Sequence, residues 1–240
     1  MKCQLLAFGA ISLVMMLLVT ACKRNSTGSD QAIQDPTDQL PSKFKTQEAV
    51  PKPNFTDAAK SPAFQQAIKD AAALLGAQPQ PLQSEVEDEQ VKGGVSFDVP
   101  QKKLEAILRQ AHTNFLARGF YLFRYQQSFG IGGQPDKIGL LPTIDKYEVM
   151  AAMDTNGDNY NIGTAGVIAW MKELEQEQPY ILTGIGFDYM EGFFTAPLKD
   201  PKALAQRMYQ FCPDIVDQGT DTVAKLAREL RNGKLYFWWD

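Results

Sequence analysis

Four carboxylates and one amide in the second half of the chain have the residue types and spacing that chemistry could use. Asp214, Asp217 and Gln218 stand together between two predicted helices, and Asp188 and Glu191 lie in or beside a predicted turn. Paired carboxylates can hold a divalent cation or act as general acid and base. Asp is also a preferred turn and cap residue. These five residues are therefore a candidate ligand cluster, with structural roles as the favoured alternative.

Nucleophilic catalysis needs a nucleophile with a base within reach. The single histidine, His112, lies in the middle of a predicted helix, and Cys212 lies far from it in the sequence. A Cys212–His112 pair would require a tertiary contact, so an inert buried thiol is the expectation. A zinc site would have only carboxylates for its remaining ligands. The sequence thus predicts no catalytic residue, no metal and no cofactor.

The run that begins at Asp154 resembles the start of a calcium-binding loop. Its sixth position, where a sharp turn needs glycine, is Asn159, and its twelfth position, where a bidentate glutamate is needed, is Ala165. We therefore expect a turn built on Asn156 and Gly157.

The aromatic residues near the end of the chain could stack a sugar or a base. They are Tyr236, Phe237, Trp238 and Trp239, with Trp170 on a predicted helix. Aromatic residues at strand and helix spacing are more often core, and that is the expectation here.

The first residues have the pattern of an export signal. Lys2 precedes an uncharged, mostly apolar run over residues 5–19, which is too short to span a bilayer and is typical of a signal peptide. The following run, 18–22, resembles the lipobox of bacterial lipoproteins. That resemblance implies cleavage before Cys22 and lipid attachment to it; the alternative is a plain signal peptide with an incidental cysteine. Lys23 resembles the sorting pattern for the outer membrane, which would place the protein there, facing the periplasm.

Composition limits the remaining function classes. The chain has 240 residues, of which 44% are hydrophobic and 22% charged, with a net charge of −4. This composition is typical of a globular protein with a packed core. A basic footprint is absent, so nucleic acid is excluded as the expected partner. The mature domain would keep one cysteine, Cys212, and could form no internal disulfide.

Hydrophobic periodicity and turn residues predict a single α+β domain, with several helices packed on a mixed or antiparallel sheet. Residues 1–21 are the signal peptide, 22–56 a lipidated flexible tether rich in polar residues and proline, 57–140 the first part of the domain, and 141–240 the second. Helices are expected over 62–75, 101–118, after Asp145, after Thr164, over 201–211 and over 221–231. Strands are expected over 95–99, 120–125, 137–141, 180–187, 193–196 and 235–239.

Two details of the predicted sheet bear on the candidate cluster. The strand over 180–187 is expected to turn near Glu191 and Gly192 before it returns. The last strand, 235–239, is apolar on both faces, which favours a place inside the sheet rather than at its edge.

Several unusual short sequence motifs occur in a specific order in the last hundred residues. They are Leu141-Pro142-Thr143, Asp145-Lys146-Tyr147, Thr155-Asn156-Gly157, Asn159-Tyr160, Val167-Ile168-Ala169-Trp170, Gly186-Phe187-Asp188, the run 211–219 and Trp238-Trp239-Asp240. Together they resemble the bacterial family called domain of unknown function 4253. The resemblance implies a compact α+β domain, no established activity and no catalytic residue.

Two hypotheses of function remain. The first is a non-enzymatic module, attached to the membrane through lipid at Cys22, that binds an envelope protein or a small ligand; an immunity-type protein that neutralises a toxin is one form of it. The second is a carboxylate- or metal-dependent hydrolase acting on envelope substrates. The scarcity of histidine favours the first.

Overall fold

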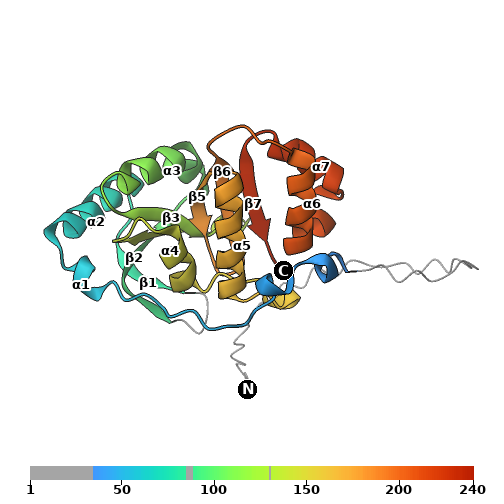
Figure 1. The fold of residues 1–240 in the computed structure, drawn as a ribbon. Coiled ribbons are helices and arrows are strands. Elements are labelled where there is room, and N and C mark those ends of the chain that lie inside the picture. Colours follow the sequence, from blue (N-terminus) through green and yellow to red (C-terminus); the bar gives the residue numbers. More distant parts are fainter. Residues whose placement is uncertain (1–34, 85–88, 130) are drawn as a thin grey trace, which may run out of the picture. The chain divides into compact units, whose positions relative to one another are not determined.

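The domain is built on one mixed seven-stranded sheet. The computed structural model describes residues 35–84, 89–129 and 131–240. The strands follow the order β1-β2-β4-β3-β5-β6-β7, and the β3–β5 pair is parallel whereas the others are antiparallel (Figure 1). The predicted α+β class is thereby confirmed. The strands are β1 Gln80–Gln83, β2 Gln90–Val99, β3 Tyr121–Gln126, β4 Asp136–Leu141, β5 Tyr180–Ile185, β6 Tyr189–Phe194 and β7 Lys234–Trp238.

Helices cover both faces of this sheet. The α-helices are α1 Thr56–Ala59, α2 Pro62–Leu75, α3 Gln101–Leu116, α4 Lys146–Met153, α5 Thr164–Glu177, α6 Pro201–Phe211 and α7 Val223–Leu230. Short 3-10 helices occur at η1 Pro36–Gln39, η2 Ser42–Phe44, η3 Ile131–Gly133 and η4 Asp158–Tyr160, and η5 Ile215–Thr220 is a π-helix. In the part of the chain that the structure describes, no helix has the length and apolar character needed to cross a membrane.

Alternation along the strands separates two hydrophobic clusters. On β3, Tyr121 and Phe123 join the larger cluster with α4, α5 and α6, while Leu122 joins the smaller one with α2 and α3. Successive side chains of a strand point to opposite faces. The sheet is therefore buried on both faces over β3 and β4.

Local signals set the boundaries of α2 and α6 where they were predicted. Ser61 caps α2 by accepting a hydrogen bond from the Phe64 N–H, and Gly76 ends the helix in a left-handed conformation. Asp200 caps α6, which begins with Pro201. On α2, Leu74 is 41% exposed.

The described part of the predicted tether packs against the domain. Leu40, Phe44 and Phe55 are buried in the larger cluster, and the Gly163 N–H donates to the Thr46 carbonyl at 2.9 Å. These apolar residues occur singly in a polar segment, so no periodicity marks them in the sequence. The signal peptide, Cys22 and the beginning of the tether lie outside the described residues.

Two predictions about the sheet are wrong. The turn after β5 falls at residues 186–188, so Glu191 and Gly192 lie inside β6 rather than at a turn. The last strand, β7, is at the edge of the sheet rather than inside it. Its residues are apolar on both faces because one face enters the core while η5 and α7 stand beside the strand. A further strand, β1, lies in a segment where no strand was expected.

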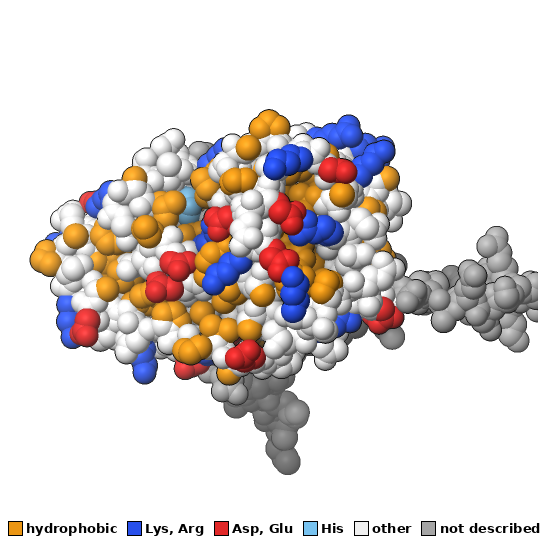
Figure 2. Space-filling model, in the orientation of Figure 1, with side chains coloured by type: hydrophobic (Ala, Val, Ile, Leu, Met, Phe, Trp, Pro, Cys, Tyr) orange, Lys and Arg blue, Asp and Glu red, His pale blue; other side chains and the backbone are white. Residues whose placement is uncertain are grey.

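The face covered by α4 and α5 is a mixed-charge surface. Figure 2 shows acidic and basic side chains intermixed over these helices. Exposed pairs of this kind contribute little stability each, so this face has the character of an ordinary solvated surface. The ion pairs are Lys146–Glu175, Lys43–Glu173 and Arg207–Glu177.

Candidate functional site

A hollow of about 880 Å³ lies on the α3 side of the sheet, over β5, β6 and β7. Its floor comes from these strands, and its walls come from α3 on one side and from η5 and α7 on the other. Ligand sites are typically hollows of this size lined by aromatic side chains with a few placed polar groups. We call it the trough, and its principal residues are Arg109, Arg124, Glu191, Phe193, Tyr236 and Trp238.

Strand alternation decides which aromatic residues enter the trough. Tyr236 and Trp238 are half-buried and line it, whereas Phe237 and Trp239 point into the larger cluster. Trp170 is also core, because its ring stacks on Phe211 with centroids 4.4 Å apart. The expectation of a core role is thus confirmed for three of the five aromatic residues. Tyr236 and Trp238 are instead available to a ligand.

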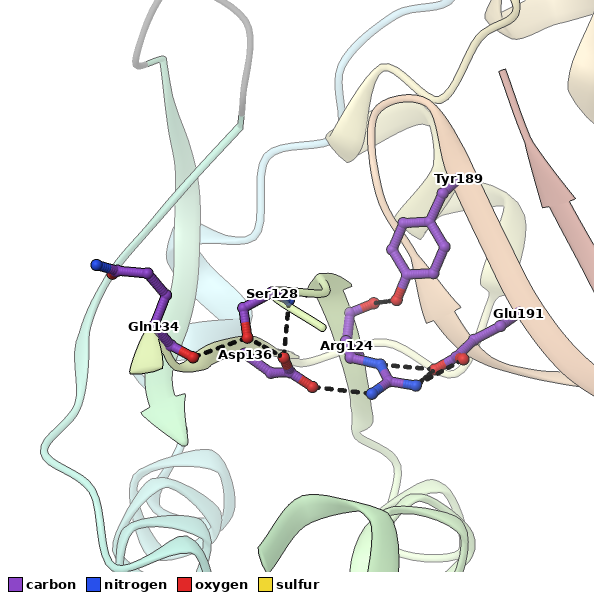
Figure 3. Close-up of polar contacts among 6 residues, drawn as sticks. All are labelled: Arg124, Ser128, Gln134, Asp136, Tyr189 and Glu191. Atoms are coloured by element: carbon purple, nitrogen blue, oxygen red, sulfur yellow. Dashed lines mark hydrogen bonds and ion pairs between the residues drawn. The ribbon is translucent and has the colours of Figure 1, made fainter. Parts of the chain in front are cut away.

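A buried charge network braces the floor of the trough (Figure 3). The Arg124 guanidinium donates from Nε and Nη2 to the two oxygens of Glu191, at 2.8 and 2.6 Å. Its Nη1 donates to Asp136 Oδ2 at 2.9 Å. The Arg124 side chain is 5% exposed and that of Asp136 fully buried. Arginine suits this place because its planar fork matches a carboxylate with two parallel hydrogen bonds.

Sheet register explains how the three charges meet. Arg124 is opposite Gly184 on β5, and Gly184 is opposite Glu191 on β6. A Cβ atom at Gly184 would lie 2.5 Å from Glu191 Cγ. Glycine at this position therefore lets the Arg124–Glu191 pair pass over the intervening strand. Asp136 lies on β4, two residues before Ile138, which pairs with Arg124. Residues two apart on a strand share a face, so Asp136 lies on the same face of the sheet as Arg124.

The remaining contacts tie the network to its surroundings. Asp136 Oδ1 accepts from the Ser128 N–H at 2.8 Å and from Ser128 Oγ at 2.9 Å, and Ser128 Oγ also donates to the Gln134 carbonyl. Tyr189 Oη donates to the Arg124 carbonyl at 3.1 Å, as Figure 3 shows. Removing one partner of a buried pair leaves an uncompensated charge and costs about 3–5 kcal/mol. The network therefore holds β3, β4 and β6 in a fixed arrangement under the trough.

Exposed charges stand at the rim of the trough. The Arg109 guanidinium lies over the Phe193 ring, 3.7 Å from its centroid, a cation–π contact. Lys234 and Glu229 are exposed on the opposite side. The trough thus combines apolar surface with charges of both signs.

Hydrogen bonds tie the residues of the predicted ligand cluster to several different partners. Glu191 joins the Arg124 network, and Asp217 accepts from Tyr209 Oη at 3.0 Å. Only Asp214 and Gln218 contact each other, through a hydrogen bond of 3.0 Å. Asp188 is half-buried; burial raises the pKa of its carboxyl, and nearby Asp240 raises it further.

Asp214 has a structural role at the end of the chain. Its Oδ1 accepts from Tyr160 Oη at 2.7 Å as well as from Gln218, and its Oδ2 accepts from the Asp240 N–H at 3.0 Å. Burial, followed by the bond to Asp214, raises the pKa of the Tyr160 phenol. The favoured structural reading of Asp214 agrees with these contacts.

Cys212 and His112 bond to separate backbone carbonyls. Cys212 Sγ donates to the Trp238 carbonyl at 2.9 Å, and burial raises the pKa of its thiol well above the usual range. His112 Nδ1 lies 2.7 Å from the Leu122 carbonyl. A thiol held protonated is a poor nucleophile. Among the described residues, no group of three or more His, Cys, Asp or Glu side chains is placed to hold a metal ion.

The run from Asp154 forms the expected turn. Asn156 Nδ2 donates to the Asp154 carbonyl at 2.7 Å, and Gly157 is bridged to Ile162. A Cβ atom at Gly157 would lie 2.7 Å from the Trp239 indole. Glycine is required there because the turn packs directly on that ring.

Arg124 and Asp136 are two residues of the charge network that sequence reasoning missed. Arg124 is the one charged residue in the run 120–125, whose other residues are aromatic or leucine. A charge inside a buried strand must be paired. That rule could have marked Arg124 as one member of an ion pair, although it would not have named the partner.

Comparison with known proteins gives a family match for part of the chain. Residues 137–240 match the family described as "Domain of unknown function (DUF4253)". The resemblance seen in the last hundred residues is confirmed over this range. No curated protein matches the chain, and no solved structure does. The match includes β4 to β7 and leaves out β3 and α3, which supply Arg124 and Arg109.

Proposed function

We propose that this protein is a non-enzymatic binding module of the bacterial cell envelope and that the trough is its binding site. A lipid on Cys22 would hold it to a membrane, most simply the outer membrane facing the periplasm. Its ligand would be an envelope protein or a small molecule rather than nucleic acid. An immunity-type protein that captures a toxin is one form of this function.

The half-buried aromatic floor of the trough carries the proposal. Phe193, Tyr236 and Trp238 present ring surface to solvent above a charge network that fixes their strands. Aromatic side chains contribute much of the energy of binding interfaces because they bury a large area at a small entropic cost. A floor that is already rigid loses little freedom on binding.

The contacts of the carboxylates favour binding over hydrolysis. Asp214 accepts hydrogen bonds from Tyr160 and Gln218, Asp217 accepts one from Tyr209, and Glu191 is engaged by Arg124. General acid–base chemistry needs carboxylates that reach a common substrate atom. No observation in the described residues favours the hydrolase over the binding module.

Lipid attachment is tested with Cys22→Ser in the full-length precursor. The variant should lose incorporation of labelled palmitate and leave the membrane fraction, because acyl chains contribute about 0.8 kcal/mol per buried CH₂. Cys212→Ser is the matched control and should keep the label. Continued labelling of Cys22→Ser would contradict the anchor.

Binding in the trough is tested by photocrosslinking in cells. Benzoylphenylalanine is placed at position 193, inside the trough, or at position 144, where Ile144 is 62% exposed and does not line it. We expect a discrete crosslinked species from position 193 and none from position 144. Equal crosslinking from both positions, or none from position 193, would contradict the trough as the binding site.

A further inference from the structure

Along β7, the backbone N–H and C=O groups of successive residues point alternately toward the partner strand β6 and toward the outer edge of the sheet. The Phe194 N–H donates to the Gly233 carbonyl at 2.8 Å, and the Trp239 N–H donates to the Asp188 carbonyl at 2.9 Å. Hydrogen-bonded and non-hydrogen-bonded pairs alternate along an antiparallel ladder. Lys234, Tyr236 and Trp238 consequently turn their backbone N–H and C=O groups away from β6.

The domain itself satisfies only the last part of this edge. The Trp238 carbonyl accepts from Cys212 Sγ at 2.9 Å, and the Asp240 N–H donates to Asp214 at 3.0 Å. Within the described residues, the backbone groups of Tyr236 and Lys234 and the Trp238 N–H have no hydrogen-bond partner off the edge. The free stretch therefore covers three alternating residues.

This free stretch faces the trough. Tyr236 and Trp238 line the hollow together with Ile215 on η5 and with Leu226 and Leu230 on α7. A backbone polar group that is shielded by apolar side chains and lacks a partner is unfavourable. The edge thus offers donors and acceptors to a ligand beside an apolar wall.

The other edge of the sheet is protected from pairing. On β1, Pro81 removes one donor, and the register shifts between Pro81 and Gln83. Proline and bulges are devices that keep an edge strand from adding another strand. The sheet thus has one closed edge and one edge open along Lys234–Trp238.

We propose that the open edge of β7 receives an extended segment of a partner polypeptide as an eighth strand. Another backbone supplies N–H and C=O groups at the two-residue spacing that Lys234, Tyr236 and Trp238 present, and its alternate side chains would pack on Leu226 and Leu230. This inference rests on the proposed function and names its ligand class.

The test uses the mature lipidated chain in detergent and a displayed library of random heptapeptides. The tightest peptide is synthesised unmodified and as a series with one backbone nitrogen methylated at a time. Methylation removes the donor without changing the side chain. We expect affinity to fall about tenfold or more at every second residue and to change little at the residues between.

A pair of protein variants tests the same edge from the other side. Tyr236→Pro removes the outward N–H without removing a bond to β6, and proline is tolerated at such edge positions. Tyr236→Ala keeps the N–H and removes the ring. We expect Tyr236→Pro to bind the peptide about tenfold more weakly than Tyr236→Ala. Cooperative melting of each variant shows that it is folded. If Tyr236→Pro does not fold, the methylated peptide series tests the added strand by itself.

The outcomes separate this inference from the proposed function. Recovery of no peptide, or loss of affinity that does not alternate along the backbone, overturns the added strand. Self-association of the mature chain that Tyr236→Pro abolishes also overturns it, because the occupant is then a second copy. Crosslinking from position 193 together with a non-alternating series leaves the trough as a binding site without strand addition.

Discussion

At the scale of single residues, the trough depends on a position with no side chain. Gly184 lies between Arg124 and Glu191 in register, and a Cβ atom there would meet Glu191 Cγ at 2.5 Å and also contact Tyr189 Oη. We expect Gly184→Ala to lower the free energy of unfolding by about 1–3 kcal/mol, the usual cost of overpacking. Gly219→Ala is the control, because the nearest atom to its added Cβ is 3.7 Å away. The free energy of unfolding of both variants is measured by urea denaturation. Equal stability of Gly184→Ala and Gly219→Ala would contradict this account.

The buried histidine predicts a pH dependence of stability. His112 is fully buried, its Nε2 has no hydrogen-bond partner among the residues that the structure describes, and its ring meets Tyr121 edge-on at 4.9 Å. Burial lowers the pKa of His112, although the bond to the Leu122 carbonyl acts in the opposite direction. Below about pH 6.5 the unfolded chain binds a proton at this residue that the folded chain does not. This contribution is therefore present above that pH and is lost as the pH falls toward the lowered pKa.

The measurement is the free energy of unfolding in urea between about pH 7.5 and about pH 5.5. We expect stability to fall with pH in the parent and to fall less steeply in His112→Gln, which cannot titrate. Other groups that titrate in this range contribute equally to both proteins. The same slope in the two proteins would show that His112 takes up its proton in the folded state as readily as in the unfolded state.

At the scale of elements, β7 serves the core on one face and the trough on the other. Phe237 and Trp239 are 0% and 2% exposed, and Trp239 Nε1 donates to the Phe211 carbonyl. Loss of a large buried aromatic side chain costs about 3–5 kcal/mol, while a whole domain has about 5–15 kcal/mol. We expect deletion of residues 235–240 to abolish cooperative thermal melting. A deletion variant that melts near the parent temperature would make β7 peripheral.

Two substitutions on neighbouring residues separate the two faces of β7. Phe237→Ala should lower the free energy of unfolding by about 3–5 kcal/mol because its ring is in the core. Tyr236→Ala should cost less, because its ring is half-buried and lines the trough. Equal losses would indicate that the two faces are packed alike.

At the scale of the whole molecule, the order of the strands implies that the residues matched by the family do not form a complete folding unit. β4 pairs with β2 and β3, and β5 pairs with β3 and β6. The matched residues, 137–240, contain β4 and β5 but not the strand between them. We expect a fragment of residues 137–240 to lack the near-ultraviolet circular dichroism of a packed domain, and residues 35–240 to show it. Cooperative unfolding of the shorter fragment would mean that β4 and β5 can pair without β3.

The sequence by itself determined the features that depend on neighbouring residues. Ser61 with Pro62 and Asp200 with Pro201 set two helix starts, because a cap involves groups within one turn. The periodicity of apolar residues likewise predicted most of the strands and the α+β class. The run 211–219 is one of the sequence motifs on which the family resemblance was based.

Only the tertiary structure decided the trough and the edge of the sheet. Arg124 and Glu191 are 67 residues apart in the chain, and their pairing depends on β5 lying between β3 and β6. The place of β7 depends in the same way on which strand pairs with β6. Strand order is a choice among long-range contacts whose energies no local pattern encodes. The residues that form the trough could therefore be recognised only once the sheet had brought them together.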